Sequence, residues 1–154
     1  MQTTGAHSSL IGQVFQDRFE IRKLLGEGST GQVFLAYDRQ ARLDRALKLI
    51  DVRQRHYPME AILRFRSEAN PLGSLEHPAI IRYIDFCQEG NVYGLVMEYL
   101  PAGTLHEYIQ QNGLPANKEF LQILLQLTGA LHYLHSRKLV HHDLKSSNIL
   151  IYRD

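Results

Sequence analysis

The pattern of apolar and polar residues in the first hundred positions predicts five β-strands. Two segments alternate with the two-residue period of a half-buried strand, and three further short apolar runs have the length of strands. The predicted strands cover residues 19–25, 32–38, 45–51, 80–86 and 92–99. Between Ala61 and Leu75, apolar residues recur at spacings of three, four or seven, which predicts one helix.

The spacing of apolar residues changes after Pro101-Ala102-Gly103, where helical patterns replace strand patterns. A short helix is predicted near 104–111 and a long one near 117–136. The order is a mostly antiparallel sheet with one helix, followed by a helical region, so the predicted fold class is α+β. We divide the chain into a flexible leader (1–17), a first lobe (18–101) and the start of a second lobe (102–154).

Composition and charge exclude several classes of protein. The 154 residues are 44% hydrophobic and 21% charged with a net charge of +1, which gives no reason to propose nucleic acid or an anionic membrane as partner. No secretory signal begins the chain, and the apolar stretch 120–134 is interrupted too often to span a bilayer. A single cysteine, Cys87, fits a reducing cytoplasm. We therefore expect a cytoplasmic protein.

A glycine-rich turn, Gly26-Glu27-Gly28-Ser29-Thr30-Gly31, connects the first two predicted strands. Glycines let backbone N–H groups approach phosphate oxygens closely. A strand rather than a helix follows, which excludes a dinucleotide-binding turn, and Gln32 stands where a Walker A loop needs lysine. A hairpin that binds nothing is the alternative for this motif alone.

Two charges interrupt apolar stripes. Lys48 shares a strand face with Ala46 and Ile50, and Glu68 lies on the apolar side of the predicted helix. Burying either charge alone is costly, so we predict a Lys48–Glu68 ion pair. The alternative, equally compatible with these residues, is that Lys48 reaches water and Glu68 lies at the edge of the stripe.

The most informative segment is His141-His142-Asp143-Leu144-Lys145-Ser146-Ser147-Asn148. Its Asp, Lys and Asn can supply a carboxylate that orients a hydroxyl, a cation for phosphate oxygens and an amide that binds a metal ion. With the glycine turn and Lys48, this segment resembles the catalytic loop of eukaryotic-like serine/threonine protein kinases, also found in bacteria. The resemblance covers residues 19–154 and implies the amino-terminal part of a kinase domain: a five-stranded antiparallel N-lobe with one helix, and the start of a helical C-lobe.

The resemblance implies ATP and Mg²⁺ as cofactors and a protein serine or threonine hydroxyl as substrate. Asp143 would receive or orient the hydroxyl proton, Lys145 would steady the γ-phosphoryl group, and Asn148 would bind magnesium. Lys48, oriented by Glu68, would hold the α- and β-phosphates. The remaining nucleotide contacts implied are the turn glycines Gly26, Gly28 and Gly31, the apolar residues Leu25, Val33, Ala46 and Leu150, the gatekeeper Met97, the backbone of Glu98 and Leu100, and Thr104 near the ribose.

Two residues depart from the family pattern. His142 stands where the family usually has an arginine that pairs with a phosphate on the activation segment, so we expect activity that does not depend on that phosphorylation. Pro71 lies three residues after Glu68 and predicts that the helix ends or kinks at Asn70. The four histidines 132, 135, 141 and 142 are interpreted as helix and loop residues rather than as a metal site.

Nothing after Asn148 supplies the family's Asp-Phe-Gly, and the helix at 117–136 has a broad apolar surface. We therefore expect this chain alone to be insoluble or partly unfolded and not to transfer phosphate. Two alternatives stay open: a kinase-like scaffold that binds nucleotide without catalysis, and a small-molecule phosphotransferase of the aminoglycoside type. The substrate, the upstream signal and the oligomeric state are not encoded in any motif found.

Overall fold

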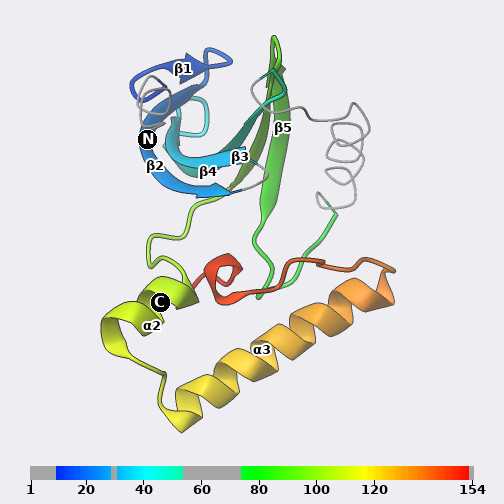
Figure 1. The fold of residues 1–154 in the computed structure, drawn as a ribbon. Coiled ribbons are helices and arrows are strands. Elements are labelled where there is room, and N and C mark those ends of the chain that lie inside the picture. The colour runs from blue at the N-terminus through cyan, green and yellow to red at the C-terminus, as the bar shows by residue number, and fades with distance from the viewer. Residues whose placement is uncertain (1–9, 29–30, 54–73, 153–154) are drawn as a thin grey trace. The chain divides into compact units, whose positions relative to one another are not determined.

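A computed structural model describes residues 10–28, 31–53 and 74–152. These residues form two compact units (Figure 1). The first unit contains the chain up to Leu75 and the segment Ile81–Tyr99, and the second contains Glu76–Ile80 and the chain from Leu100 onward. The lobe boundary predicted after residue 101 therefore lies two residues too late, and it misses the short segment Glu76–Ile80.

The first unit is a six-stranded antiparallel sheet with the order β1-β2-β3-β4-β6-β5 (Figure 1). The predicted strands are confirmed, although several extend beyond the predicted limits. The strands are β1 (Val14–Phe15), β2 (Phe19–Gly28), β3 (Gly31–Asp38), β4 (Leu43–Asp51), β5 (Tyr83–Glu89) and β6 (Val92–Glu98).

The flexible leader predicted for residues 1–17 needs correction, because β1 lies within it. Val14 and Phe15 pair with β2, and Phe15 is buried in the core of the sheet. This strand raises the count from the five predicted to six. The helix predicted between Ala61 and Leu75, with its end at Asn70, falls outside the described residues except at its last positions.

The core lies on one face of this sheet. Leu47 and Val96 are cross-strand partners in β4 and β6, and both are fully buried. The core also contains Phe15, Phe19, Ile21, Phe34, Ala36 and Leu49. Alternation along β4 sends Leu47 and Leu49 to this face and leaves Ala46 and Lys48 on the other.

Gly94 makes room for β1 in this core. A Cβ atom at Gly94 would lie 2.8 Å from the Cys87 sulfur and 2.9 Å from the Phe15 ring. The absence of a side chain therefore allows Phe15 to pack over β6. Burial raises the pKa of the Cys87 thiol to about 12, so this thiol stays neutral and acts as a small apolar group.

Contacts from the turn between β1 and β2 bring the two edges of the sheet together. The Gln16 backbone N–H donates to the Glu89 carboxylate at 2.7 Å, and the Gln16 side chain donates to the Gln88 carbonyl, both in β5. Arg18, in the same turn, reaches Asp85 in β5 at 2.9 Å. Because β5 is the edge opposite β1 in the strand order, these contacts show that the sheet curls around its core.

Arg18 also holds the one buried carboxylate among the described residues. Its guanidinium makes a bidentate contact with Asp38 at 2.9 and 2.8 Å, and the Asp38 side chain is fully buried. The backbone N–H groups of Gln40 and Ala41 donate to the same carboxylate at 3.0 and 3.1 Å. The Arg18 hydrogen bond in particular lowers the pKa of Asp38 from 3.8 to about 2.

The second unit contains α2 (Leu105–Asn112), α3 (Asn117–Ser136) and a 3₁₀ turn η1 (Ser146–Asn148). Both predicted helices are confirmed. Thr104 begins α2 with a capping box, in which its hydroxyl accepts from the Glu107 N–H while the Glu107 carboxylate accepts from the Thr104 N–H. Leu105 is buried behind this cap.

The segment Glu76–Ile80 attaches to α3 through Tyr133. The Glu76 N–H donates to the Tyr133 hydroxyl at 3.0 Å, and the ring of His77 lies 5.1 Å from the Tyr133 ring. On the same aromatic ring lies the Arg137 guanidinium, 3.7 Å from its centroid. Tyr133 therefore connects a segment from earlier in the chain to the carboxyl-terminal half of α3.

The amino-terminal half of α3 is largely exposed. Leu121 and Leu125 are 57% and 64% exposed, and Phe120 and Leu124 are also on the surface. Such a contiguous apolar helix surface is unusual in a protein that is stable by itself. None of the helices described has the length and apolar character needed to cross a membrane.

We predict that Arg18→Gln lowers the free energy of unfolding at pH 7 by about 3 kcal/mol, because it leaves the buried Asp38 carboxylate without its cation. The matched control is Arg22→Gln, since Arg22 pairs with Asp44 and Glu20 at the surface. Exposed pairs contribute little, so this variant should lose at most about 1 kcal/mol. Urea unfolding of the full gene product that contains this chain measures the free energy of unfolding of both variants. Equal losses in the two variants would show that the buried Asp38 carboxylate does not depend on Arg18.

The same pair predicts an acid dependence. The pKa of Asp38 is lower in the folded chain than its ordinary value of 3.8, so the stabilisation is complete above about pH 4 and is lost as the pH falls toward about 2. The loss should be about 2 kcal/mol in the wild type. In Arg18→Gln this acid-dependent part should largely disappear, which unfolding curves across this pH range would show.

Candidate active site

The strand register places four of the predicted nucleotide residues on one face of the first unit. Lys48 in β4 is the direct partner of Val33 in β3 and of Leu95 in β6. Ala46, two residues earlier, is the partner of Met97. Side chains of directly opposed residues point to the same side of a sheet, so Val33, Ala46, Lys48 and Met97 share the face opposite the core.

This face combines apolar side chains with a lysine. Ala46 and Leu95 are buried, and Val33, Lys48 and Met97 are half-buried, so an apolar strip adjoins a single cation. Leu25 lies at a register irregularity between Leu24 and Gly26 and is half-buried. Glu68 falls outside the described residues, so the predicted Lys48–Glu68 ion pair stays a prediction.

The three glycines of the turn differ in what requires them. Gly31 has a φ of 123°, and a Cβ atom there would lie 2.4 Å from the Leu49 carbonyl oxygen. Gly31 is therefore required by the close approach of β4. A Cβ atom at Gly26 or Gly28 would meet nothing within 4 Å. Packing among the described residues does not require these two glycines. Because they carry no side chain, a ligand can approach their backbone closely.

The residues predicted at the base and ribose lie partly in each unit. In the first unit, the Glu98 N–H donates to the Arg82 carbonyl at 2.9 Å. The backbone group of Glu98 that is left for adenine is therefore its carbonyl oxygen, which could accept a hydrogen bond. In the second, Leu100 is half-buried, and Thr104 pairs with Leu150 in an isolated antiparallel bridge.

Thr104 also caps the amino-terminal end of α2, a structural role that the sequence prediction did not include. Its hydroxyl donates to the Glu107 carboxylate at 3.0 Å and accepts from the Glu107 N–H at 3.2 Å. A hydroxyl has one proton to donate, so Thr104 could offer a ribose only a lone pair. The signal for this cap was present in the sequence as Thr-x-x-Glu ahead of the predicted helix.

The catalytic-loop residues predicted from the sequence lie together in the second unit. The Lys145 ammonium contacts Oδ2 of Asp143 at 2.9 Å, and the Asn148 side-chain NH₂ donates to the same oxygen at 3.0 Å. The Asn148 NH₂ also donates to the Asp143 carbonyl at 2.8 Å. Among the described residues both side-chain contacts end on Oδ2, which leaves Oδ1 of Asp143 available.

Lys145 sets the charge state of this carboxyl group. Its hydrogen bond lowers the pKa of Asp143 below the ordinary value, and the Asn148 amide acts in the same direction. Asp143 is therefore ionised at neutral pH and is a weak base. Such a group orients a hydroxyl well and takes its proton only late in a reaction.

The backbone around the loop is anchored at its far end. The Leu105 N–H donates to the Ile149 carbonyl at 2.8 Å, and the Ile151 N–H donates to the Gly103 carbonyl at 2.9 Å. These bonds join the residues after Asn148 to the start of α2. The 3₁₀ turn between Lys145 and Ile149 then directs the Asn148 side chain back onto Asp143.

The donor set of the loop fits magnesium. Because the NH₂ group of Asn148 donates to Asp143, the Oδ1 atom of Asn148 is left as an acceptor. Amide and carboxylate oxygens are ligands that Mg²⁺ prefers. Among the described residues there is no cluster of three or more His, Cys, Asp and Glu side chains that could hold a metal ion.

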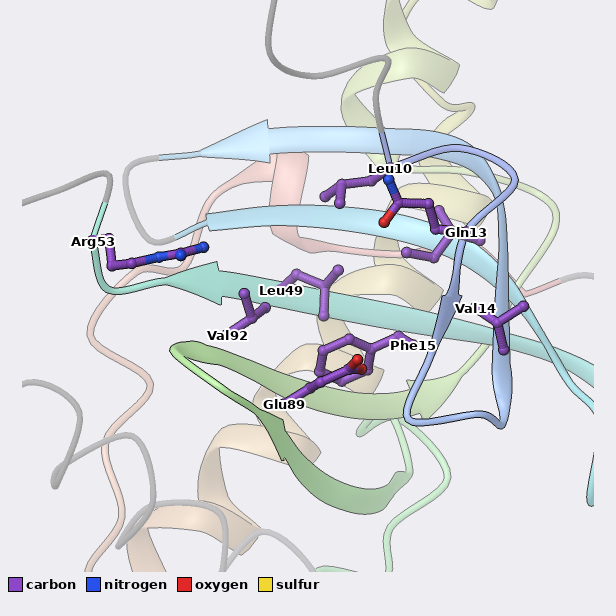
Figure 2. A pocket seen from close by; sticks show the side chains of 9 residues that line it. Leu10, Gln13, Val14, Phe15, Leu49, Arg53, Glu89 and Val92 are labelled. Atoms are coloured by element: carbon purple, nitrogen blue, oxygen red, sulfur yellow. The ribbon is translucent and has the colours of Figure 1, made fainter.

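A surface hollow in the first unit is lined by residues of the core face of the sheet (Figure 2). Its volume is about 240 Å³, and its lining comes from both ends of the sheet. Leu49 and Phe15, which line it, belong to the core face rather than to the face of Lys48. The full lining is Leu10, Gln13, Val14, Phe15, Ile21, Leu49, Arg53, Glu89 and Val92.

The chain thus combines an antiparallel sheet that carries a glycine turn and Lys48 with a helical unit that carries an Asp-Lys-Asn loop. Residues 19–154 match the family model of the protein kinase domain. The chain belongs to the protein kinase domain family. Members of this family use ATP with Mg²⁺, in agreement with the donor set of the loop.

Several curated relatives are serine/threonine kinases. The chain is 38% identical over 142 residues to serine/threonine-protein kinase PrkC of Bacillus subtilis, and 34% identical over 143 residues to the probable serine/threonine-protein kinase PknB of Lactococcus lactis. Each match covers 92% of this chain and 22% of the relative. Aurora kinase B-A of Xenopus laevis is 32% identical over 136 residues, or 88% of this chain and 37% of the relative. The chain thus spans about a fifth of the length of the two bacterial relatives.

We predict that Gly31→Ala destabilises the first unit by at least about 2 kcal/mol, because a side chain would both strain the backbone and overlap Leu49. Gly28→Ala, in the same turn, should change the stability by less than about 0.5 kcal/mol. Thermal unfolding of the two variants in the full gene product compares them directly. Equal melting temperatures would show that the close approach of β4 does not depend on Gly31.

Proposed function

We propose that this chain supplies the nucleotide-holding and catalytic-loop residues of a kinase that transfers the γ-phosphoryl group of ATP to protein serine or threonine hydroxyls. The observation that carries the proposal is the Asp143, Lys145 and Asn148 cluster, in which Oδ1 of Asp143 stays available while Oδ2 is held by two donors. Membership of the kinase family and the serine/threonine kinases among the relatives support it.

The first unit would hold the nucleotide. The apolar strip of Val33, Ala46 and Met97 suits an adenine ring, and the carbonyl of Glu98 can accept from its amino group. Lys48, on the same face, is a point charge for phosphate oxygens. Gly26 and Gly28 would let the turn approach the phosphates, since no packing partner among the described residues fills the space a side chain would take.

The second unit would carry out the transfer. Oδ1 of Asp143 would accept a hydrogen bond from the substrate hydroxyl and receive its proton late, because the lowered pKa makes this group a weak base. Lys145 would share its ammonium between Asp143 and the transferred phosphoryl oxygens. Mg²⁺ supplies neutralisation of the phosphate charge when bound, and Oδ1 of Asn148 is the atom of this loop that would hold it.

Serine and threonine specificity rests on Lys145, which stands two residues after Asp143 as in serine/threonine kinases. We further propose that the domain works in the cytoplasm, where ATP and Mg²⁺ are abundant and where the single cysteine stays reduced. The scaffold alternative is less well supported, because Lys48, Asp143 and Asn148 are all retained and the last two are in contact.

We predict that Asp143→Asn lowers kcat for phosphate transfer at least 100-fold, because the amide cannot receive a proton. The assay supplies labelled ATP together with casein and an aminoglycoside to the full gene product, and it identifies which of the two is labelled and on which amino acid. Asp44→Asn, which removes an exposed carboxylate of the first unit, is the control and should keep full activity.

Label on serine or threonine, and its loss in Asp143→Asn alone, support the proposal. Three results would contradict it: no transfer by the wild type, transfer confined to tyrosine, or transfer to an aminoglycoside in place of the protein. The last result would select the small-molecule phosphotransferase.

A further inference from the structure

Helix α3 ends in a conformation that favours glycine. The Leu139 N–H donates to the Leu134 carbonyl at 3.0 Å, and the Lys138 N–H donates to the His135 carbonyl at 2.9 Å. These two bonds define a Schellman motif, in which the first residue beyond the helix has a left-handed backbone. Lys138 occupies that place with a φ of 60°. Glycine adopts this conformation without steric cost, so the side chain of Lys138 is kept at a cost to stability.

No contact within the described part of the chain accounts for the Lys138 side chain. It is exposed, and it makes no hydrogen bond or ion pair among the described residues. A cation at the carboxyl end of a helix interacts favourably with the helix dipole. Arg137, the C-cap residue, already supplies a cation at that end. The helix therefore has this interaction without Lys138.

Arg137 is held in a fixed orientation beside Lys138. Its guanidinium lies 3.7 Å from the centroid of the Tyr133 ring, and the Tyr133 hydroxyl is itself held by the Glu76 N–H at 3.0 Å. A guanidinium stacked on an aromatic ring keeps its N–H donors available at its edge. Among the described residues its side chain donates only to the Ser136 hydroxyl, over a long distance of 3.4 Å. Arg137 thus presents an oriented set of donors that is largely unused.

No acid beside these two cations balances their charge. Residues 132–142 contain four histidines, one arginine, one lysine and no aspartate or glutamate. Of the acids described in the second unit, Glu107, Glu119 and Asp143 accept hydrogen bonds elsewhere. Glu76 makes no ion pair with either cation in the described part of the chain. The carboxyl end of α3 is therefore a positively charged surface that fits an anionic partner.

We propose that Arg137 and Lys138 form a docking site for a phosphorylated serine or threonine in a segment of a partner protein. A phosphoryl group carries close to two negative charges and three acceptor oxygens at neutral pH. Arginine binds two such oxygens in a bidentate manner, and lysine adds a point charge. A carboxylate carries one charge, which Arg137 alone would balance, so the retention of Lys138 favours the phosphoryl group. The site contains no residue of the catalytic loop, and binding there does not require phosphate transfer by this chain.

Fluorescence anisotropy of the full gene product with a labelled peptide tests this docking site. The probe is a short peptide of glycine and alanine with one central phosphoserine, and two comparison peptides carry serine or glutamate in its place. We expect the phosphopeptide to bind at least about tenfold more tightly than either, because one additional hydrogen bond between charged groups contributes about that factor.

Two variants test the assignment to Arg137 and Lys138. Arg137→Gln and Lys138→Gly should each weaken binding of the phosphopeptide at least about fivefold, whereas Lys138→Arg, which keeps the charge, should bind within about twofold of the wild type. Lys138→Gly should also raise the melting temperature by about 2 °C, because glycine removes the left-handed strain. The matched control is Lys118→Gln, an exposed lysine at the other end of α3, which should change neither quantity.

Weaker binding together with higher stability in Lys138→Gly supports the inference, because a purely structural role would lower the stability. No binding by the wild type, or an affinity that Lys138→Gly leaves unchanged, overturns it. Equal affinities for the glutamate peptide and the phosphopeptide also overturn it, since the surface would then respond to negative charge alone. A lower melting temperature of Lys138→Gly would show that Lys138 serves the helix end and would contradict the inference.

Discussion

The first unit depends on one buried ion pair. The Asp38 carboxylate ends β3 on the core face of the sheet, where no water replaces a missing partner, and Arg18 reaches it from the turn before β2. The same guanidinium extends to Asp85 at the opposite edge. One cation therefore joins the start, the middle and the far edge of the sheet, and the removal of either charge would leave the other uncompensated.

This pair also bears on the face of the sheet that carries Lys48. Asp38 and Val33 belong to the same strand, and the pairing of that strand with β4 places Val33 against Lys48. A one-residue slip of register would send every side chain of a strand to the other face. Asp38, held by Arg18, fixes one end of β3. At the other end Gly31 leaves room for the Leu49 carbonyl of β4, so both ends of β3 hold the register. The second unit is organised differently: few of its side chains are buried, and its loop is held by hydrogen bonds to backbone groups.

Most of the strands and helices can be predicted from the sequence because they depend on local periodicity. Alternation predicts β2 and β3, short apolar runs predict β4, β5 and β6, and the patterns at 104–111 and 117–136 predict α2 and α3 to within one or two residues. β1 was missed because two residues carry no period, and because its stability comes from the burial of Phe15 beside a glycine 79 positions later. The partners of Arg18 lie 20 and 67 residues away, and no local pattern encodes such distances. In the candidate site, motif spacing predicts Asp143, Lys145 and Asn148, whereas the contacts that hold Oδ2 of Asp143 are visible only in the structure.

In the proposed function, Oδ1 of Asn148 in the loop of the second unit would hold the magnesium of a bound nucleotide. Calorimetric titration of the full gene product with ATP, with and without Mg²⁺, tests it most directly. Mg²⁺ should tighten ATP binding in the wild type. Asn148→Ala should remove most of this gain, while ATP without the metal should bind both proteins equally. An affinity that is the same with and without Mg²⁺, or an Asn148→Ala variant that keeps the full gain, would contradict it.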